Sequence, residues 1–323
     1  GAMLRSESEP VSRGQAQRGR SYWRISLRRL MRKKLGVACL AIILLMYGAG
    51  ILAPVVTPYG YNDHNLAVAK QGPSLSHPFG TDRLGRDILT RVIFGLRTTV
   101  IITITTLVTG SLALGITLGL IAGYFGRFID TLIMRVGEVT SAFPEIFLVL
   151  IIIATVKPPV TEWVRGIEDT LGVDIVRLGI VDYLVIALAL SIFSWFGMAR
   201  LVRGQVLQIR ENQYIEAARA IGGSTPRILL SHVLPNVLPP VIVVVSAGLA
   251  AVAGSEVFLS FLGIGIQPPT PSLGLMIFEN ASISVLRTNP HLLLFPVGIL
   301  AVLLLCFSLL GDAMNDAFNP RAR

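Results

Sequence analysis

The sequence predicts an all-α polytopic membrane protein with six transmembrane helices, a cytoplasmic helix-turn-helix, and an external re-entrant or surface loop before the last span. Of its 323 residues, 53% are hydrophobic and only 15% are charged, whereas soluble domains carry about 25% charged residues. Several uncharged runs are long enough to cross about 30 Å of hydrocarbon. One polar stretch, residues 214–236, separates two apolar runs, and a polar helix-turn-helix there requires a partner outside the bilayer.

Residues 1–35 form a basic tail before the first apolar run. Ten of the 28 Lys and Arg residues lie there beside two Glu, so this tail holds most of the net charge of +9. A basic segment next to a span predicts a cytoplasmic N-terminus by the positive-inside rule, and it attracts anionic lipid. The position of the charge therefore indicates contact with membrane lipid and argues against nucleic acid as a partner.

Five uncharged runs are clear candidates for spans, and we expect all five to be free of charge. They are residues 36–56, 98–126, 183–199, 233–255 and 292–311. In the second of them, Gly115, Gly119 and Gly123 recur every four residues. Such a stripe of small residues lets another helix approach closely, and we expect packing within the chain more than contact with another subunit.

A sixth span is expected at about residues 133–156. It contains Arg135, Glu138 and Glu145, so its first turns should lie at an interface or face the interior of the bundle. Pro144 is expected to kink it.

Residues 257–278 are uncharged but contain three prolines and three glycines. Such backbone cannot cross lipid as one regular helix, because irregular backbone at membrane depth is tolerated only against protein or a water-filled cavity. We therefore expect an external re-entrant or surface-lying loop within residues 256–291.

The charges of the loops predict that both ends of the chain are cytoplasmic. With the termini and residues 127–135 and 200–227 inside, 19 Lys and Arg residues lie in the cytoplasm and nine lie outside. This is the asymmetry that the positive-inside rule describes.

Two external loops have distinctive compositions. The loop 57–97 contains HPFGTDRLGRDILTR at residues 77–91, which is compatible with a metal or phosphate site; we favour a tight turn capped by Asp82 and followed by a helix from about Asp87. The acidic loop 157–182 spaces Trp163, Val164, Ile167 and Leu171 as a short amphipathic helix lying along the surface.

Motifs of nucleotide and metal enzymes are absent from the sequence. It has no G-x-x-x-x-G-K-[ST] phosphate loop, no H-E-x-x-H, no C-x-x-C and no G-x-S-x-G. ATP is therefore not bound in that way. We expect a chain that is not an enzyme and binds no metal or cofactor of its own.

Residues 200–236 leave the membrane with a polar sequence in which Gly222 and Gly223 end one helix. Ser224 or Thr225 can then cap the next helix, and Pro226 is near its first turn. Ala217 and Ala218 give the first helix a flat face that a partner's groove can approach. We expect two short helices that project as a knob from the cytoplasmic face.

At these residues the chain resembles the permease subunits of ABC importers. The signature of that family is present as Glu216, Ala217, Ala218 and Gly222 followed by Leu234 and Pro235, with His232 where the general pattern has Ile. The resemblance implies a coupling helix-turn-helix that docks into a groove of a separate ATPase subunit. The residues it assigns to this contact are Tyr214, Ile215, Glu216, Ala217, Ala218, Arg219, Gly222, His232 and Pro235.

Three further motifs resemble the second, or C-type, permease of dipeptide/oligopeptide importers. They are HPFGTDRLGRDILTR, LSFLGIGIQPPTPSLG at residues 259–274, and GDAMNDAFNPR at residues 311–321. One departure is Leu273, where such permeases usually have Trp; another is the length of the loop 157–182. Residues expected to face the external side and the binding protein are Asp82, Arg86, Asp87, Gln267 and Leu273.

The resemblance implies a permease core over residues 98–323, preceded by the tail 1–35, a first span 36–56 and the external loop 57–97. Its partners would be a homologous permease subunit in a heterodimer, two ATPase subunits that bind ATP and Mg, and an extracytoplasmic substrate-binding protein. The complex would import short peptides across a bacterial or archaeal inner membrane. Relatives with the same motifs carry nickel chelates, glutathione or other small cargo, so these alternatives stay open.

A different class of function is a stand-alone channel or ion-coupled carrier. Such proteins place ionisable residues or broken helices at mid-membrane. In this sequence only Arg135, Glu138 and Glu145 are candidates, which disfavours that interpretation.

Overall fold

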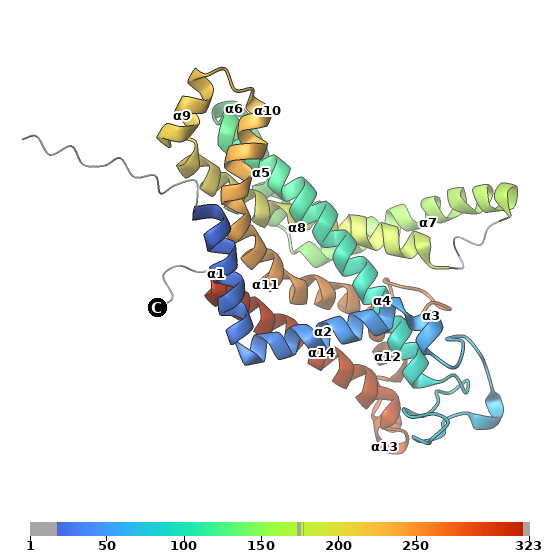
Figure 1. Cartoon of the computed structure of the whole chain (residues 1–323). Helices are drawn as coiled ribbons and strands as arrows, with labels where there is room; N and C mark the ends of the chain where they lie inside the picture. Colours follow the sequence, from blue (N-terminus) through green and yellow to red (C-terminus); the bar gives the residue numbers. More distant parts are fainter. Residues whose placement is uncertain (1–17, 173–175, 177, 319–323) are drawn as a thin grey trace, which may run out of the picture.

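The computed structural model describes residues 18–172, 176 and 178–318. Over this range the fold is helical, and the only β-type pairing described is one bridge between Thr81 and Asp87. The elements are α1 (Arg18–Arg32), α2 (Lys34–Ile51), α3 (Ala53–Val56), the 3-10 turn η1 (Leu66–Val68), α4 (Ile88–Thr106), the π-helix η2 (Leu107–Gly115), α5 (Ile116–Phe125), α6 (Arg127–Ser141), α7 (Glu145–Leu171), α8 (Ile180–Ile209), α9 (Gln213–Ala220), α10 (Thr225–Ile228), the π-helix η3 (Leu229–Val233), α11 (Leu234–Phe261), α12 (Leu273–Asn280), α13 (Ile283–Thr288) and α14 (His291–Phe318). The arrangement is drawn in Figure 1.

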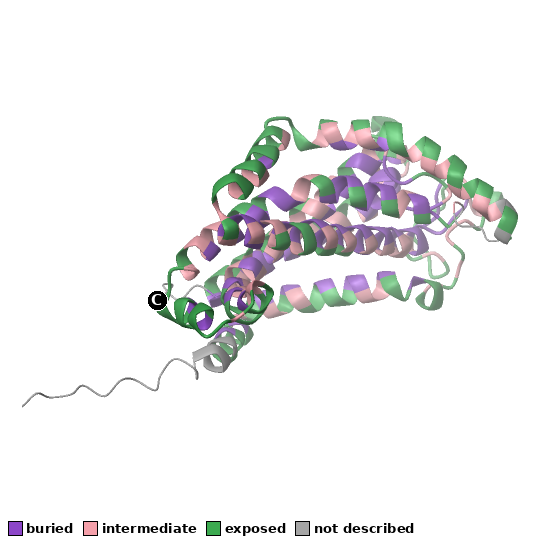
Figure 2. Ribbon diagram, turned by 90° about the horizontal axis from the view of Figure 1, so that it is seen from above, coloured by how far each residue is buried: buried purple, intermediate pink, exposed green. Residues whose placement is uncertain are grey.

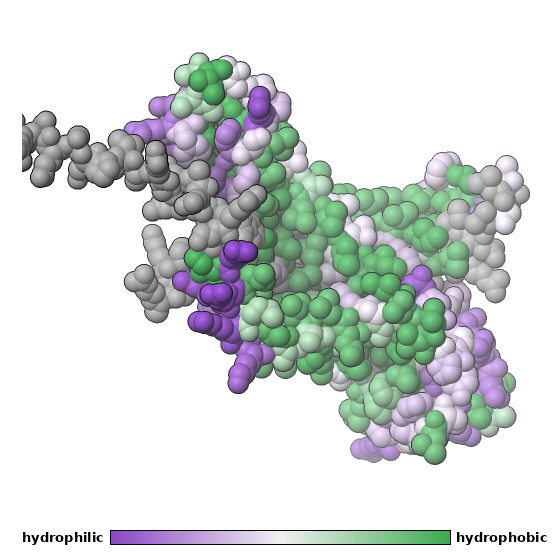
Figure 3. Space-filling model, viewed as in Figure 1, coloured by the Kyte–Doolittle hydropathy of each residue, from purple (hydrophilic) through white to green (hydrophobic). Residues whose placement is uncertain are grey.

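Six helical segments of the described chain are long and apolar enough to cross a membrane. They are Lys34–Ile51, Ile88–Phe125, Glu145–Glu168, Ile180–Ile209, Thr225–Phe261 and His291–Phe318. Hydrophobic residues cover the middle of the visible face, while hydrophilic residues gather near α9 and α1 at one end and over the loops before α4 at the other (Figure 3). This distribution fits a bundle that crosses a bilayer, and the prediction of six spans is confirmed.

The helix α8 is packed most closely against the segment formed by η2 and α5, through the glycine stripe. A Cβ atom on Gly119 would lie 2.7 Å from Cβ of Val202, and one on Gly123 would lie 2.6 Å from Cβ of Val206. Real Cβ atoms do not approach so closely, so only glycine permits this helix separation. The expectation that the stripe serves packing within the chain is confirmed, and buried positions run along the central helices (Figure 2).

The span expected at residues 133–156 is two helices, not one kinked helix. Helix α6 ends at Ser141, and α7 begins at Glu145. Pro144 has extended ψ of 118° and lies at the N-cap of α7. Because proline has no N–H to donate to the preceding turn, it suits the start of a helix and not its interior.

Helix α7 also continues through the first half of the segment expected to be an external loop. Trp163 and Val164 belong to this helix, so the prediction of a separate amphipathic helix on the surface is wrong. Val160 and Val164 pack against a buried cluster that includes Ile186 of α8. This burial favours continuation of the helix past the two prolines at 158–159.

The uncharged run 257–278 is irregular, as expected. Helix α11 ends at Phe261, residues 262–272 form a loop with a cis peptide bond between Pro268 and Pro269, and the buried helix α12 follows. Lys157 of α7 forms an ion pair with Asp182 of α8 over 3.0 Å and donates from Nζ to the carbonyl of Gly265 over 3.2 Å. These contacts hold the loop against α7 and against the start of α8.

Part of the basic tail is the helix α1, and residues 1–17 lie outside the described residues. Leu30 of α1 is buried in a small cluster with Ala313 and Phe318 of α14. Lys33 pairs with Asp316. The first and last described helices therefore meet at the same end of the bundle (Figure 1).

Candidate functional site

The short helix α9 stands at one end of the molecule, between the end of α8 and the start of α10 (Figure 1). Ile215 is fully buried and Ala218 is 9% exposed, and both pack with Val202 and Val206 of α8 and Ile228 of α10. These contacts fix the helix on the bundle. Its remaining face is exposed.

That free face combines polar and apolar side chains. Tyr214 is 41% exposed and Ile221 is 87% exposed, and Glu216, Ala217 and Arg219 are also exposed. Arg219 is oriented by Tyr124 of α5, with its guanidinium 5.0 Å from the ring centroid and an Nε to Oη distance of 3.3 Å. Exposed apolar residues beside fixed charges are typical of a protein contact surface.

The glycine pair forms the corner after α9. Gly222 has φ of +82°, the left-handed conformation that glycine adopts without strain, and the N–H of Gly223 donates to the carbonyl of Ala218 over 2.9 Å. Ser224 is the N-cap residue of α10, without a side-chain hydrogen bond to cap it.

The second half of the predicted helix-turn-helix differs from the expectation of two short helices. α10, η3 and α11 run on as one helical segment from Thr225 to Phe261. His232 and Pro235 lie on this segment, about two to three turns beyond the corner, and both are exposed. The structure thus groups Tyr214 to Gly222 on one short element and places His232 and Pro235 on the adjoining span.

At the opposite end of the bundle, Asp82 organises a buried cluster. Its Oδ2 accepts from Nε of Arg86 and from Nη1 of Arg91, each over 2.7 Å, and its Oδ1 accepts from the backbone N–H of Arg86 over 3.0 Å. Glu279 of α12 lies 3.7 Å from Arg91. Burial raises the pKa of the Asp82 carboxyl, but the two guanidinium groups and these hydrogen bonds outweigh it, so its pKa lies below its ordinary value.

The neighbouring Asp87 caps α4 by accepting from the N–H of Thr90 over 2.7 Å, and its other oxygen is 2.9 Å from Nδ1 of His77. Gly85 has φ of +73°, and a Cβ there would collide with the carbonyl oxygen of Asn65. The charges of this loop therefore pair locally around a tight turn, as the turn interpretation predicts.

Four of the five residues expected to face an external partner are buried. Asp82, Arg86 and Asp87 are 4–5% exposed, and Leu273 at the start of α12 is fully buried. Gln267 is exposed, and its backbone N–H donates to Asp182 over 3.0 Å. The four buried side chains stabilise the fold and are not available on the surface of this chain. The sequence could not show this, because charged residues in a polar loop normally face water.

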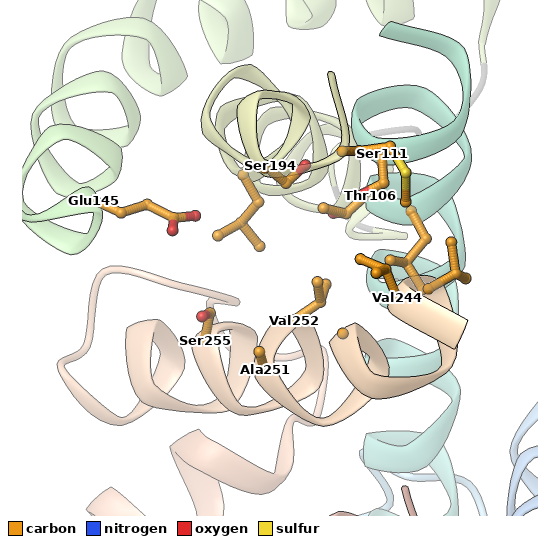
Figure 4. Close-up of a pocket in the computed structure, with 14 residues that line it drawn as sticks. Thr106, Ser111, Glu145, Ser194, Val244, Ala251, Val252 and Ser255 are labelled. Atoms are coloured by element: carbon orange, nitrogen blue, oxygen red, sulfur yellow. The ribbon is translucent and has the colours of Figure 1, made fainter. Parts of the chain in front are cut away.

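A cavity of about 220 Å³ lies among α4, η2, α7, α8 and α11 (Figure 4). Its wall is mainly aliphatic, with hydroxyl groups from Thr106, Ser111, Ser194 and Ser255. The carboxylate of Glu145 points into it (Figure 4). Within the described residues, it is the one ionisable side chain in the wall.

A second acidic residue in the spans was missed by the sequence analysis. Glu256 of α11 is fully buried; it accepts from Oγ1 of Thr99 over 2.9 Å and from Oγ of Ser260 over 3.1 Å. The expectation of five charge-free spans is therefore wrong, because α11 continues beyond Ser255, where the uncharged run ends. The sequence feature that could have indicated a buried carboxylate was the position of Glu256 between two apolar stretches.

Six spans, a cavity whose mainly aliphatic wall carries hydroxyl groups and one carboxylate, and a protruding polar helix at one end define a multi-pass component of a membrane transport system. Comparisons with known proteins identify which kind. Residues 115–323 match the family described as the binding-protein-dependent transport system inner membrane component, and residues 21–73 match the N-terminal TM domain of oligopeptide transport permease C. The chain belongs to this family of inner-membrane permease components.

Curated relatives resemble the chain over nearly its whole length. The dipeptide transport system permease protein DppC of Alkalihalophilus pseudofirmus is 36% identical over 303 residues, which cover 94% of this chain and 91% of the relative. The oligopeptide transport system permease protein OppC of Escherichia coli is 35% identical over 318 residues, covering 94% and 93%. OppC of Mycobacterium tuberculosis is 33% identical over 297 residues, covering 92% and 94%.

Proposed function

We propose that this chain is one of two permease subunits of an ATP-driven importer of short peptides in a bacterial or archaeal inner membrane. The names of the relatives, which are dipeptide and oligopeptide transport permeases, support peptide as the cargo. The loop charges support an orientation in which α9 and both termini are cytoplasmic. Nickel chelates or glutathione are the alternative cargoes for the same machinery.

The geometry of α9 is the observation that carries this proposal. A buried Ile215 anchors the helix to two spans, while Tyr214, Glu216 and Ile221 present a free face. An ATPase subunit that receives this face can move α8 and α11 together. The sequence has no phosphate loop, so ATP and Mg belong to the partner subunits in this proposal, and the permease transmits motion between two arrangements.

The cavity supports a second permease as a partner. Its walls come from five elements of this chain and remain partly open, so a homologous subunit can complete the pathway in a heterodimer. An extracytoplasmic binding protein would deliver peptide to the end that carries Gln267. The basic side chains at the C-terminal end of α1, Arg28, Arg29 and Arg32, would lie near anionic lipid headgroups.

Purification of the tagged chain from its own membranes tests the proposal. We expect two ATPase subunits and a second permease to copurify, and the reconstituted complex to hydrolyse ATP faster with peptide-loaded binding protein. Glu216→Lys and Gly222→Val should reduce this stimulation or the recovery of ATPase. Glu162→Lys, an exposed carboxylate on α7, is the matched control. Wild-type stimulation and transport in both Glu216→Lys and Gly222→Val would contradict the proposed role.

A further inference from the structure

The cavity has an unpaired carboxylate at its edge. Glu145 is the first residue of α7, and its side chain makes no hydrogen bond or ion pair with any residue that the structure describes. Two other acidic groups of the long helical segments have partners: Glu256 accepts from two hydroxyls, and Asp182 pairs with Lys157. Glu145 begins a candidate span and is exposed in the isolated chain, and ionisable residues in spans mark the paths of substrates or ions.

Two hydroxyl groups of the cavity are also free to bind a ligand. The hydroxyls of Thr106 and Ser194 donate to backbone carbonyls of α8, those of Ala187 and Ser191. Ser111 and Ser255 line the same cavity, and among the described residues their side chains have no hydrogen-bond partner. One carboxylate and two hydroxyls therefore face a largely aliphatic space without protein partners.

These hydrogen-bond acceptors suit one chemical group. A carboxylate and hydroxyl oxygens accept hydrogen bonds from an ammonium group, which carries three donors, and a hydrogen bond between two ionised groups is stronger than one between neutral groups. We propose that Glu145 binds a cationic amino group of the cargo as it passes through the cavity, whose wall offers further acceptors at Ser111 and Ser255. This inference rests on the proposed function as a peptide permease.

The amino group can come from the N-terminus of a peptide or from a lysine side chain. Four peptides separate these sources: a neutral tripeptide with a free N-terminus, its N-acetylated form, and the acetylated form with lysine or norleucine at the middle position. Uptake into proteoliposomes is measured for each peptide with wild-type and Glu145→Gln complexes. Each peptide is presented to both complexes on the same binding protein. Differences in how well the peptides are delivered therefore cancel in the ratio of the uptake rates of the two complexes.

We expect Glu145→Gln to slow uptake of peptides with an amino group by about tenfold, as loss of a charge-assisted hydrogen bond would do. Uptake of acetylated peptides without lysine should be unchanged. Loss confined to free N-termini identifies the terminal ammonium, and loss confined to lysine identifies the side chain. Ser111→Ala with Ser255→Ala should give a smaller loss with the same selectivity. Glu162→Gln, on the same helix but outside the cavity wall, should have no effect.

Equal slowing of all delivered peptides, or no slowing of any, would overturn the inference. If the binding protein delivers only peptides with an amino group, Glu145→Lys serves as the test instead. It should abolish uptake of these peptides, while the neutral Glu145→Gln and Glu145→Ala variants should share one rate between those of Glu145→Lys and the wild type. Equal rates in all three variants would overturn it. The failure of the proposed function is a separate outcome, since a wild-type complex would then show neither peptide uptake nor stimulated ATP hydrolysis.

Discussion

Arg203 of α8 donates two hydrogen bonds to Asp130 of α6, from Nε to Oδ1 over 2.6 Å and from Nη2 to Oδ2 over 2.5 Å. The pair lies shortly before the end of α8, where the chain turns into α9. A bidentate contact fixes both the distance and the orientation of two side chains. It therefore joins the short helix α6 to the span that carries α9.

Replacing Arg203 by lysine should loosen α6, because an ammonium group cannot form the two parallel hydrogen bonds of a guanidinium. Since the pair is partly exposed, at 34% and 15% of the two side chains, the loss of stability should be no more than about 1 kcal/mol. Hydrogen exchange should become faster in residues 127–141. Arg135→Lys is the control, because Arg135 pairs within α6 with Glu138; equal effects in both variants would refute this role.

Asp82 should make stability depend on pH in the acidic range. Its folded-state pKa lies below the ordinary value, so its contribution is present above an unfolded-state pKa of about 3.9 and is lost as pH falls through the folded pKa. Asp82→Asn should abolish this part of the pH dependence. It should also lower the free energy of unfolding near pH 7 by up to about 3 kcal/mol, because Arg86 and Arg91 stay buried with only Glu279, 3.9 and 3.7 Å away, to balance their charge.

Thermal unfolding of the purified chain in detergent between pH 3 and pH 7 measures both effects of Asp82. Asp63→Asn is the matched control, because Asp63 is exposed in the same loop and accepts from the N–H of Gly60. A wild-type acid profile in Asp82→Asn would show that the buried cluster does not contribute in this way.

Gly119→Ala should destabilise the contact between α5 and α8. The new methyl carbon would lie 2.7 Å from both Cβ of Val202 and the carbonyl oxygen of Ala199, and overpacking of this kind costs about 1–3 kcal/mol. In the control variant Gly204→Ala on α8, the new Cβ meets no atom within 4 Å. This variant should leave the midpoint temperature of thermal unfolding unchanged or raise it, because alanine favours helix. Thermal unfolding of the two variants measures the difference; equal midpoints would contradict the packing interpretation.

The sequence predicted the number of spans, the glycine packing and the turn around Asp82, because these features depend on local composition and spacing. It did not predict that α7 continues to Leu171, since Pro158 and Pro159 suggest an end and the favourable packing of Val164 against the buried cluster that includes Ile186 of α8 is a tertiary contact. Elements far apart in the chain produce this contact, so periodicity alone does not show it.

The candidate site shows the same division between local and tertiary features. The residues of α9 and its glycine corner could be found from their order in the sequence, whereas the burial of Asp82 and Leu273 depends on α4 and α12 covering them. The cavity is formed by five elements, and its hydroxyl groups lie up to 149 positions apart between Thr106 and Ser255. No motif joins them.

The central claim is that α9 docks on an ATPase subunit. A photoreactive maleimide attached to Ala217→Cys tests it in membranes that contain the whole complex; the native Cys39 and Cys306 are buried and give little background. Leu75→Cys, fully exposed in the loop before α4, is the control. We predict a cross-link from residue 217 to the ATPase and none from residue 75. A complex that copurifies intact but forms no ATPase cross-link from residue 217 would contradict the account.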